Sequence, residues 1–218
     1  MSQSLPKKPV LLKAIELILA DPGEIRRETL KLKEKYLEKY RDSHTEEKIN
    51  EMIIRKIISN YSYYSAFVGG ATALTGVVPG LGTVMAAFGG ATTDMALTMK
   101  YQVEMTMAIA TICGHDIGLE EEKRLCFIVA GLGTINEAIK KGGKQVGNRA
   151  FNELIKKYVQ TASAQAVKEV FKKVGITLSR KAAKKAIPFG VGVVIGFSAN
   201  KVLTYYVGNR VRKFFISN

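Results

Sequence analysis

Apolar residues recur along most of this chain at the three- and four-residue spacing of helices, and no segment alternates like a strand. The pattern predicts a short amphipathic helix over 9–20, ended by a Pro-Gly break at 21–23, and a mostly charged helix over 24–41. After a polar break, Thr45 is a predicted N-cap, because acidic residues open the helix that follows it.

The centre of the sequence is an uncharged segment of 37 residues, at positions 57–93, that is rich in Gly and Ala. Pro79-Gly80 breaks it near the middle. We expect a helical hairpin with one arm over about 57–78 and the other over about 82–113, since small residues let two helices pack closely.

The rest of the chain predicts further helices and a second uncharged run at 186–200. Helices are expected over about 119–140, 148–174 and 201–215, and residues 178–186 bring four further cations. The predicted fold class is all-α, a multi-helix bundle around the central Gly/Ala-rich helical hairpin. We divide the chain into N-terminal charged helices at 1–44 and a helical domain at 45–218.

Positive charge is concentrated in the last third of the chain. The net charge is +14, and residues 140–218 hold 17 Lys and Arg against two acidic residues. This asymmetry indicates an anionic partner, which could be lipid headgroups, nucleic acid or an acidic protein. The cations flank apolar segments, which favours an anionic membrane surface over nucleic acid. The candidate headgroup-binding residues are Lys140, Lys141, Lys144, Arg180, Lys181, Lys184 and Lys185.

Two stretches carry a resemblance to a known family. The stretch TGVVPGLGTVMAAFGGATTDMALTMKYQVEMTMAIATICGHDI resembles the signature of EcsC-type proteins, at Pro79, Gly80, Asp94, Gln102, Ile109, Ala110, Gly114 and Asp116. The stretch IPFGVGVVIGFSANKVLTYYVGNRVRKFF is similar to the family's ending, with Asn200 in place. The resemblance covers roughly residues 50–216. It implies a membrane-associated accessory role beside an exporter, and it implies no activity.

The sequence contains no recognisable catalytic or metal-binding pattern. GxSxG, HExxH and GxxxxGK[ST] are absent, and neither Cys113 nor Cys126 belongs to a CxxC pair. His44 and His115 have no ligand-spaced partner. We therefore expect a protein that is not an enzyme and that has no cofactor or metal.

Three polar residues lie in apolar surroundings and are buried polar candidates: Asp94, Gln102 and Asn200. Asp94 and Gln102 share one helical stripe, because they are eight residues apart. Burying a carboxylate is costly unless it is bonded, so Asp94 needs a partner. The sequence leaves open whether these residues form a structural polar contact or an ion or proton site.

The central hairpin suggests how a membrane would be engaged, and three alternatives stay open: it spans the bilayer, inserts conditionally, or stays buried. The candidate insertion residues are Phe67, Val77, Val78, Leu81 and Phe88. The N-terminus has no apolar core of signal-peptide length, which predicts a cytoplasmic protein, peripheral to or embedded in the inner face of the membrane.

The function that these patterns favour is that of a non-enzymatic, membrane-associated accessory protein. It would bind the cytosolic face through the basic C-terminal third and the apolar hairpin. One alternative is a soluble helical module that docks on a membrane transporter or another protein. Another is an enzyme with an unrecognised site near Asp94, Gln102 and Asn200.

Overall fold

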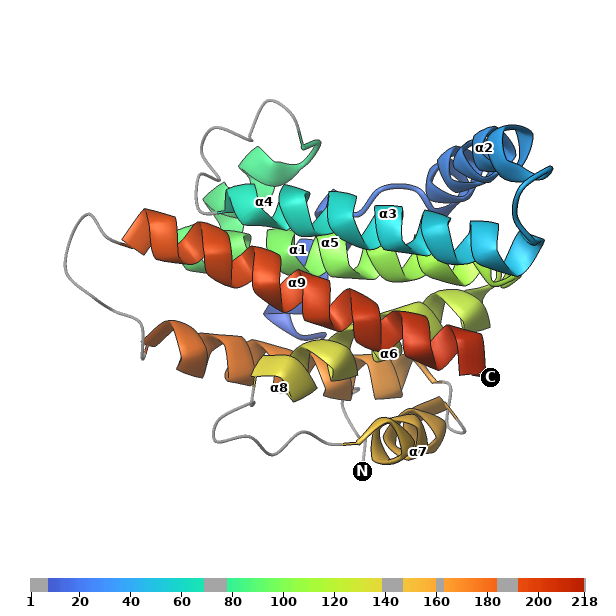
Figure 1. The fold of residues 1–218 in the computed structure, drawn as a ribbon. Helices are drawn as coiled ribbons and strands as arrows, with labels where there is room; N and C mark the ends of the chain where they lie inside the picture. The colour runs from blue at the N-terminus through green and yellow to red at the C-terminus, as the bar shows by residue number, and fades with distance from the viewer. Residues whose placement is uncertain (1–7, 69–77, 139–146, 160–162, 184–191, 218) are drawn as a thin grey trace.

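The computed structural model describes residues 8–68, 78–138, 147–159, 163–183 and 192–217. Over these ranges the regular structure is entirely helical and the helices pack as a bundle (Figure 1), which confirms the predicted fold class. The helices are α1 (Val10–Ile18), α2 (Pro22–Tyr40), α3 (Glu46–Ala66), α4 (Leu81–Phe88), α5 (Gly90–Ile112), α6 (Glu120–Ala138), α7 (Asn148–Val159), α8 (Ala164–Ala183) and α9 (Gly192–Ser217).

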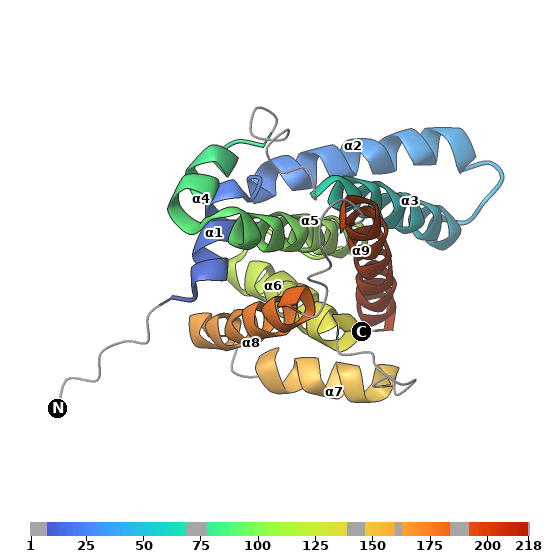
Figure 2. The ribbon, with the colours of Figure 1, turned by 90° about the vertical axis from the view of Figure 1, so that its left-hand side faces the viewer.

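Helix α5 lies at the centre of the bundle. It packs against α1, α2, α3, α4, α6 and α9, and Figure 2 shows it between α2 above and α6 below. Every residue from Ala96 to Ile112 except Tyr101 is buried. A helix covered on all sides favours apolar or small residues around its circumference, with any buried polar side chain paired, which explains the Ala- and Met-rich sequence of α5.

Helices α3 and α9 run side by side, in opposite directions, on the face of Figure 1 that is turned to the viewer. Gly208 makes their close approach possible. A Cβ at this position would lie 2.9 Å from both Cγ1 and Cγ2 of Ile58 on α3, and 2.9 Å from Sδ of Met105 on α5. The three helices therefore meet where α9 has no side chain.

Near the N-terminus, α1 and α2 are separated as predicted, but Pro22 and Gly23, which were expected to form the break, open α2 instead. The Asp21 side chain accepts a hydrogen bond from the Glu24 backbone N–H at 3.1 Å, so it caps α2 ahead of Pro22 in the first turn. The Thr45 hydroxyl accepts from the Lys48 backbone N–H at 3.4 Å and caps α3. Helices α1 and α2 both pack on α5, so residues 8–44 contribute to the same core as the rest of the bundle.

The central hairpin differs in detail from the expectation. Its second arm is two helices, α4 and α5, because Gly89 adopts a positive φ of 77° between them. Gly80 also has a positive φ, of 78°, and its added Cβ would lie 2.5 Å from the Leu17 carbonyl oxygen of α1. The turn before α4 is thus pressed against α1. Residues 69–77 of the first arm lie outside the described residues.

The C-terminal helix boundaries also differ from the expected ones. The helix predicted over 148–174 is divided, and α8 begins after Ser163, whose hydroxyl accepts from the Ala166 backbone N–H at 3.3 Å. Helix α8 then continues through Gly175 as far as Ala183. Helix α9 begins at Gly192 and so includes part of the second uncharged run.

Candidate functional site

Gln102 lies at a hydrogen-bonded cluster that joins four helices. Its Nε2 donates to the Thr204 hydroxyl of α9 at 3.2 Å, and its Oε1 accepts from the Thr134 hydroxyl of α6. The Ser65 hydroxyl of α3 shares a hydrogen bond of 2.8 Å with the Thr204 hydroxyl and lies 3.0 Å from the Asn200 carbonyl oxygen. All four side chains are buried, so their polar atoms satisfy one another within the core.

Asp94 does not belong to this cluster. It is half-buried two turns before Gln102 on α5, about 12 Å along the helix axis. No side chain among the described residues donates a hydrogen bond to its carboxylate, and loss of solvation raises its pKa to about 6. The structure therefore brings Gln102 and the Asn200 backbone together through Thr204 and Ser65, and it leaves Asp94 apart.

A buried ion pair on α5 was not foreseen from the sequence. The Lys100 ammonium group donates to Oε1 of Glu104, and the two side chains are only 9% and 5% exposed. The same oxygen accepts from the Ala20 backbone N–H at 2.9 Å, which ties the link between α1 and α2 to the central helix. Burial and the nearby Glu104 charge raise the pKa of Tyr101. The spacing of four residues between Lys100 and Glu104 was the available signal.

Two of the seven candidate headgroup-binding residues lie within the described residues. Arg180 is exposed on α8, and Lys181 lies in the last turn of that helix. The other five, Lys140, Lys141, Lys144, Lys184 and Lys185, lie outside the described residues. Helices α7 and α8 carry further exposed cations: Arg149, Lys156, Lys157, Lys172 and Lys173. Lys173 Nζ donates to the Tyr158 hydroxyl at 2.7 Å, which raises the pKa of Lys173.

The candidate insertion residues have unlike surroundings. Val78 and Leu81 are buried in the core at the start of α4, so in this conformation they do not contact solvent. Phe88 is half-buried, and Val77 lies outside the described residues. Phe67, directly after α3, is 57% exposed. Of the four that the structure describes, Phe67 is the most exposed.

Phe67 belongs to an aromatic and basic surface that the sequence did not predict, here called the α3–α9 face. Its residues are Lys56, Tyr63, Tyr64, Phe67, Lys201, Val202, Tyr205 and Tyr206, and its large hydrophobic side chains are each about half exposed. Lys201 Nζ lies 3.6 Å from the centre of the Tyr63 ring, a cation–π contact between α9 and α3.

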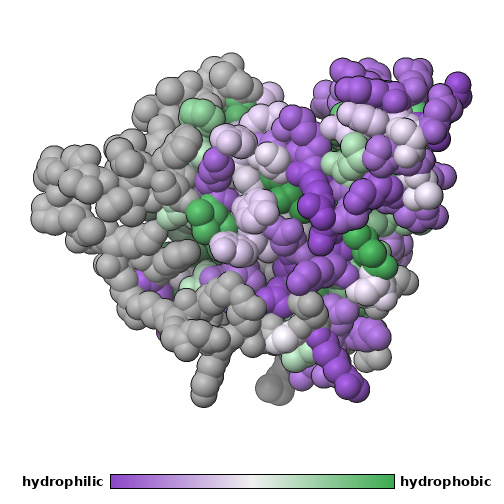
Figure 3. All heavy atoms as spheres, viewed as in Figure 1, coloured by the Kyte–Doolittle hydropathy of each residue, from purple (hydrophilic) through white to green (hydrophobic). Residues whose placement is uncertain are grey.

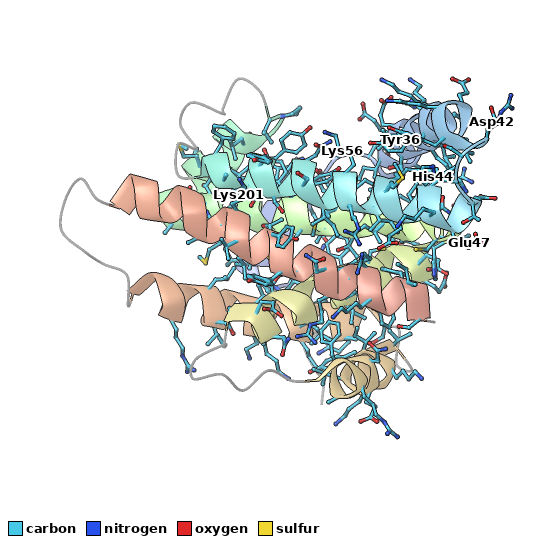
Figure 4. The ribbon with its side chains drawn as sticks, in the orientation of Figure 1. Tyr36, Asp42, His44, Glu47, Lys56 and Lys201 are labelled. Carbon is cyan, nitrogen blue, oxygen red and sulfur yellow. The ribbon has the colours of Figure 1, made fainter. Side chains whose placement is uncertain are left out.

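The figures show where the α3–α9 face lies. Lys56 and Lys201 project from α3 and α9 in Figure 4. In Figure 3, pale and hydrophobic residues interrupt the hydrophilic surface over these two helices. The sequence does show aromatic residues at the end of α3 and at neighbouring positions of α9. Only the antiparallel packing of the two helices brings them onto one surface.

The cavities on the described surface include the three that follow. The first, about 540 Å³, lies between α1, the following link, α6 and α8, and has Lys8, Glu16, Lys123 and Phe127 in its walls. The second, about 290 Å³, lies between α2, α3 and α5. The third, about 240 Å³, is lined by Arg55, Ile58, Tyr205, Asn209 and Arg212 of α3 and α9. None of these cavities is lined by Asp94, Gln102 or Asn200.

The described ranges contain neither a clustered metal site nor a helix of membrane-spanning character. No group of three or more His, Cys, Asp and Glu side chains there is placed to hold a metal ion. Among the described helices, none combines the length and the apolar composition that are needed to cross a lipid bilayer.

Comparison of the chain with family models, with curated proteins and with solved structures found no match. The resemblance to EcsC-type proteins therefore rests on the sequence motifs alone.

Proposed function

We propose that this chain is a non-enzymatic accessory protein of the EcsC type that binds the surface of an anionic membrane. The observation that carries the proposal is the α3–α9 face. It exposes four tyrosines and Phe67 next to Lys56 and Lys201. Tyrosine rings favour the headgroup level of a bilayer, where the ring is apolar and the hydroxyl is solvated, and lysine favours anionic headgroups.

The basic C-terminal third supports the same proposal through longer-range attraction. The described residues of α7 and α8 have two acidic side chains, Glu153 and Glu169, against a larger number of exposed cations. Each Lys or Arg close to an anionic surface contributes about 1 kcal/mol of binding free energy. Arg180, Lys181 and the five candidate lysines beyond the described residues remain part of the proposed contact.

This mode of binding is peripheral. Val78 and Leu81 are packed in the core, so an approach through the α3–α9 face needs no rearrangement of α4. Conditional insertion of the hairpin would require those two side chains to leave the core. An alkaline carbonate wash distinguishes the two modes, since only an inserted protein withstands it.

The test is flotation of the purified chain with vesicles of phosphatidylcholine alone and with vesicles that also contain phosphatidylglycerol, at low and high salt. We expect salt-sensitive flotation with the anionic vesicles only, lost on carbonate treatment. Phe67→Ser should weaken flotation, whereas Leu119→Ser, at a similarly exposed position between α5 and α6, should leave it unchanged. Absence of flotation under every condition would refute the proposal and favour the alternative of a soluble module that docks on another protein.

A further inference from the structure

The third cavity lies between two facing stripes of α3 and α9. Arg55 and Ile58 are three residues apart on α3, while Tyr205, Asn209 and Arg212 follow at helical spacing on α9. Its volume of about 240 Å³ is below the ~300–1,000 Å³ of pockets that hold whole drug-sized ligands. The cavity therefore suits one small group, presented by a ligand whose remainder stays outside.

The wall of this cavity carries more positive than negative charge. Glu51 is the shared counter-ion of three cations, with Oε1 at 2.7 Å from Arg55 Nη2 and 3.0 Å from Arg212 Nη1, and Oε2 at 3.9 Å from Lys48 Nζ. The hydrogen bond from Arg55 is the main cause of the lowered pKa of Glu51. One carboxylate cannot neutralise three cations, so an anion entering the cavity meets a net attraction.

One buried donor at the cavity has no acceptor. Arg212 Nη1 bonds to Glu51, but the Nε–H is buried and makes no hydrogen bond with any described residue. Native proteins rarely leave such a donor unpaired. Because the Nε–H has almost no solvent-accessible area, the Arg212 side chain must turn before its Nε edge can pair with two oxygens of a phosphate or carboxylate.

Two neutral groups complete the lining. Tyr205 contributes a hydroxyl that can donate, and it belongs to the α3–α9 face as well as to the cavity. Asn209 Nδ2 donates to the Tyr205 carbonyl oxygen at 2.9 Å, which leaves the Asn209 amide oxygen as an acceptor for a ligand hydroxyl. We propose that this cavity binds a phosphate group, held by Arg55, Arg212 and Tyr205.

The phosphate can come from a soluble phosphate ester or from a lipid headgroup. The shared residue Tyr205 places the cavity at the edge of the α3–α9 face, within reach of headgroups if that face contacts a membrane. The phosphate site does not depend on the membrane proposal, because soluble phosphate would bind the same groups.

The test follows the arginine Nε–H signals of ¹⁵N-labelled protein by nuclear magnetic resonance during titration with inorganic phosphate. Sodium chloride at equal ionic strength is the reference. We expect a saturable shift of the Arg212 signal with phosphate only, and none for Arg149, which is exposed on α7. A shift of Arg212 no larger than that of Arg149, or one reproduced by chloride, would overturn the proposal.

Two variants make the test specific. Arg212→Lys keeps the charge but loses the guanidinium edge, and it should weaken phosphate binding roughly tenfold, as loss of one hydrogen bond between charged groups does. Tyr205→Phe should weaken it less, and Arg149→Lys should leave it unchanged. Unaltered phosphate affinity in Arg212→Lys, with helical content retained by circular dichroism, would contradict the assignment.

Vesicles then identify the source of the phosphate. If Arg212→Lys also lowers flotation with vesicles containing phosphatidic acid, while Arg149→Lys does not, the ligand is a lipid headgroup. If the phosphate-dependent shift occurs and flotation is the same in both variants, the ligand is a soluble phosphate ester. Failure of the chain to float at all would refute the membrane proposal and leave the phosphate shift as a separate result.

Discussion

At the scale of single residues, Asp94 and Gln102 show how two polar groups on one helix stripe can have opposite surroundings. Gln102 has a partner for both ends of its amide, on α6 and on α9. Asp94 is half-buried without a side-chain donor among the described residues, and its pKa is raised from 3.8 to about 6. Its ionised form is thus less favourable in the folded chain than in the unfolded one.

This difference predicts a pH-dependent stability. Because the folded pKa is the higher one, the contribution of Asp94 is fully present below pH 3.8 and is lost as pH rises through about 6. At pH 8, Asp94→Asn should therefore have a free energy of unfolding about 1 kcal/mol higher than that of the native chain, after allowing for solvent screening. Urea denaturation measures this gain, which should shrink towards pH 4. Asp42→Asn, at an exposed position, is the control. An equal gain at both pH values would contradict the assignment.

At the scale of helices, close packing depends on a few glycines whose role the sequence pattern does not reveal. Gly208 lies on α9 against Ile58 and Met105, so close that an added Cβ would be only 2.9 Å from atoms of both residues. Gly175 lies on α8, where the nearest atom to an added Cβ is 3.9 Å away, an ordinary contact. Two glycines in helix interiors thus have different functions in the bundle.

Alanine at these two positions should have opposite effects. Gly208→Ala should lower the free energy of unfolding by about 1–3 kcal/mol, because α3 and α5 must shift to accept the methyl group. Gly175→Ala should raise it by up to ~1 kcal/mol through helix propensity. Chemical denaturation of both variants measures the two changes. Stabilisation by both would show that α9 can move away from α3 without cost.

The sequence allowed the existence of most helices, and the cap at Thr45, to be predicted from local chemistry. It did not reveal the break at Gly89 or the continuity of α8 through Gly175, since both depend on how neighbouring helices pack. The Gly208 approach and the pairing of Tyr63 with Lys201 join positions more than a hundred residues apart in sequence. The sequence therefore shows the residues of the α3–α9 face only as two separate groups, one on each helix.

At the scale of the whole molecule, the exposed cations of the C-terminal third and the mixed charges of α2 lie on different sides of the bundle. Helix α2 lies in the upper part and α8 in the lower part of the bundle in both views (Figures 1 and 2). Helix α2 carries Lys31 close to Glu28, at 3.1 Å, so its cations are locally balanced. An anionic surface should therefore attract α8 more strongly than α2.

Charge reversal on the two sides tests this orientation. Lys172→Glu combined with Arg180→Glu on α8 should lower the affinity for phosphatidylglycerol vesicles, measured by flotation, by roughly 30-fold or more. Two favourable contributions of about 1 kcal/mol each to the binding free energy are removed. Lys31→Glu combined with Lys35→Glu changes the net charge equally but lies on α2. Equal losses from the two pairs would mean that only net charge matters and that no side is preferred.

The cluster around Gln102 also bears on how the bundle comes apart. Hydrogen bonds from α3, α5, α6 and α9 converge on neighbouring atoms within it. If one of these helices moved away alone, it would leave unpaired polar groups behind in a dry interior, so its separate departure is disfavoured. The backbone amides of these four helices should consequently exchange with deuterium at a common slow rate and belong to one cooperative unit, while those of α7, on the periphery, exchange sooner.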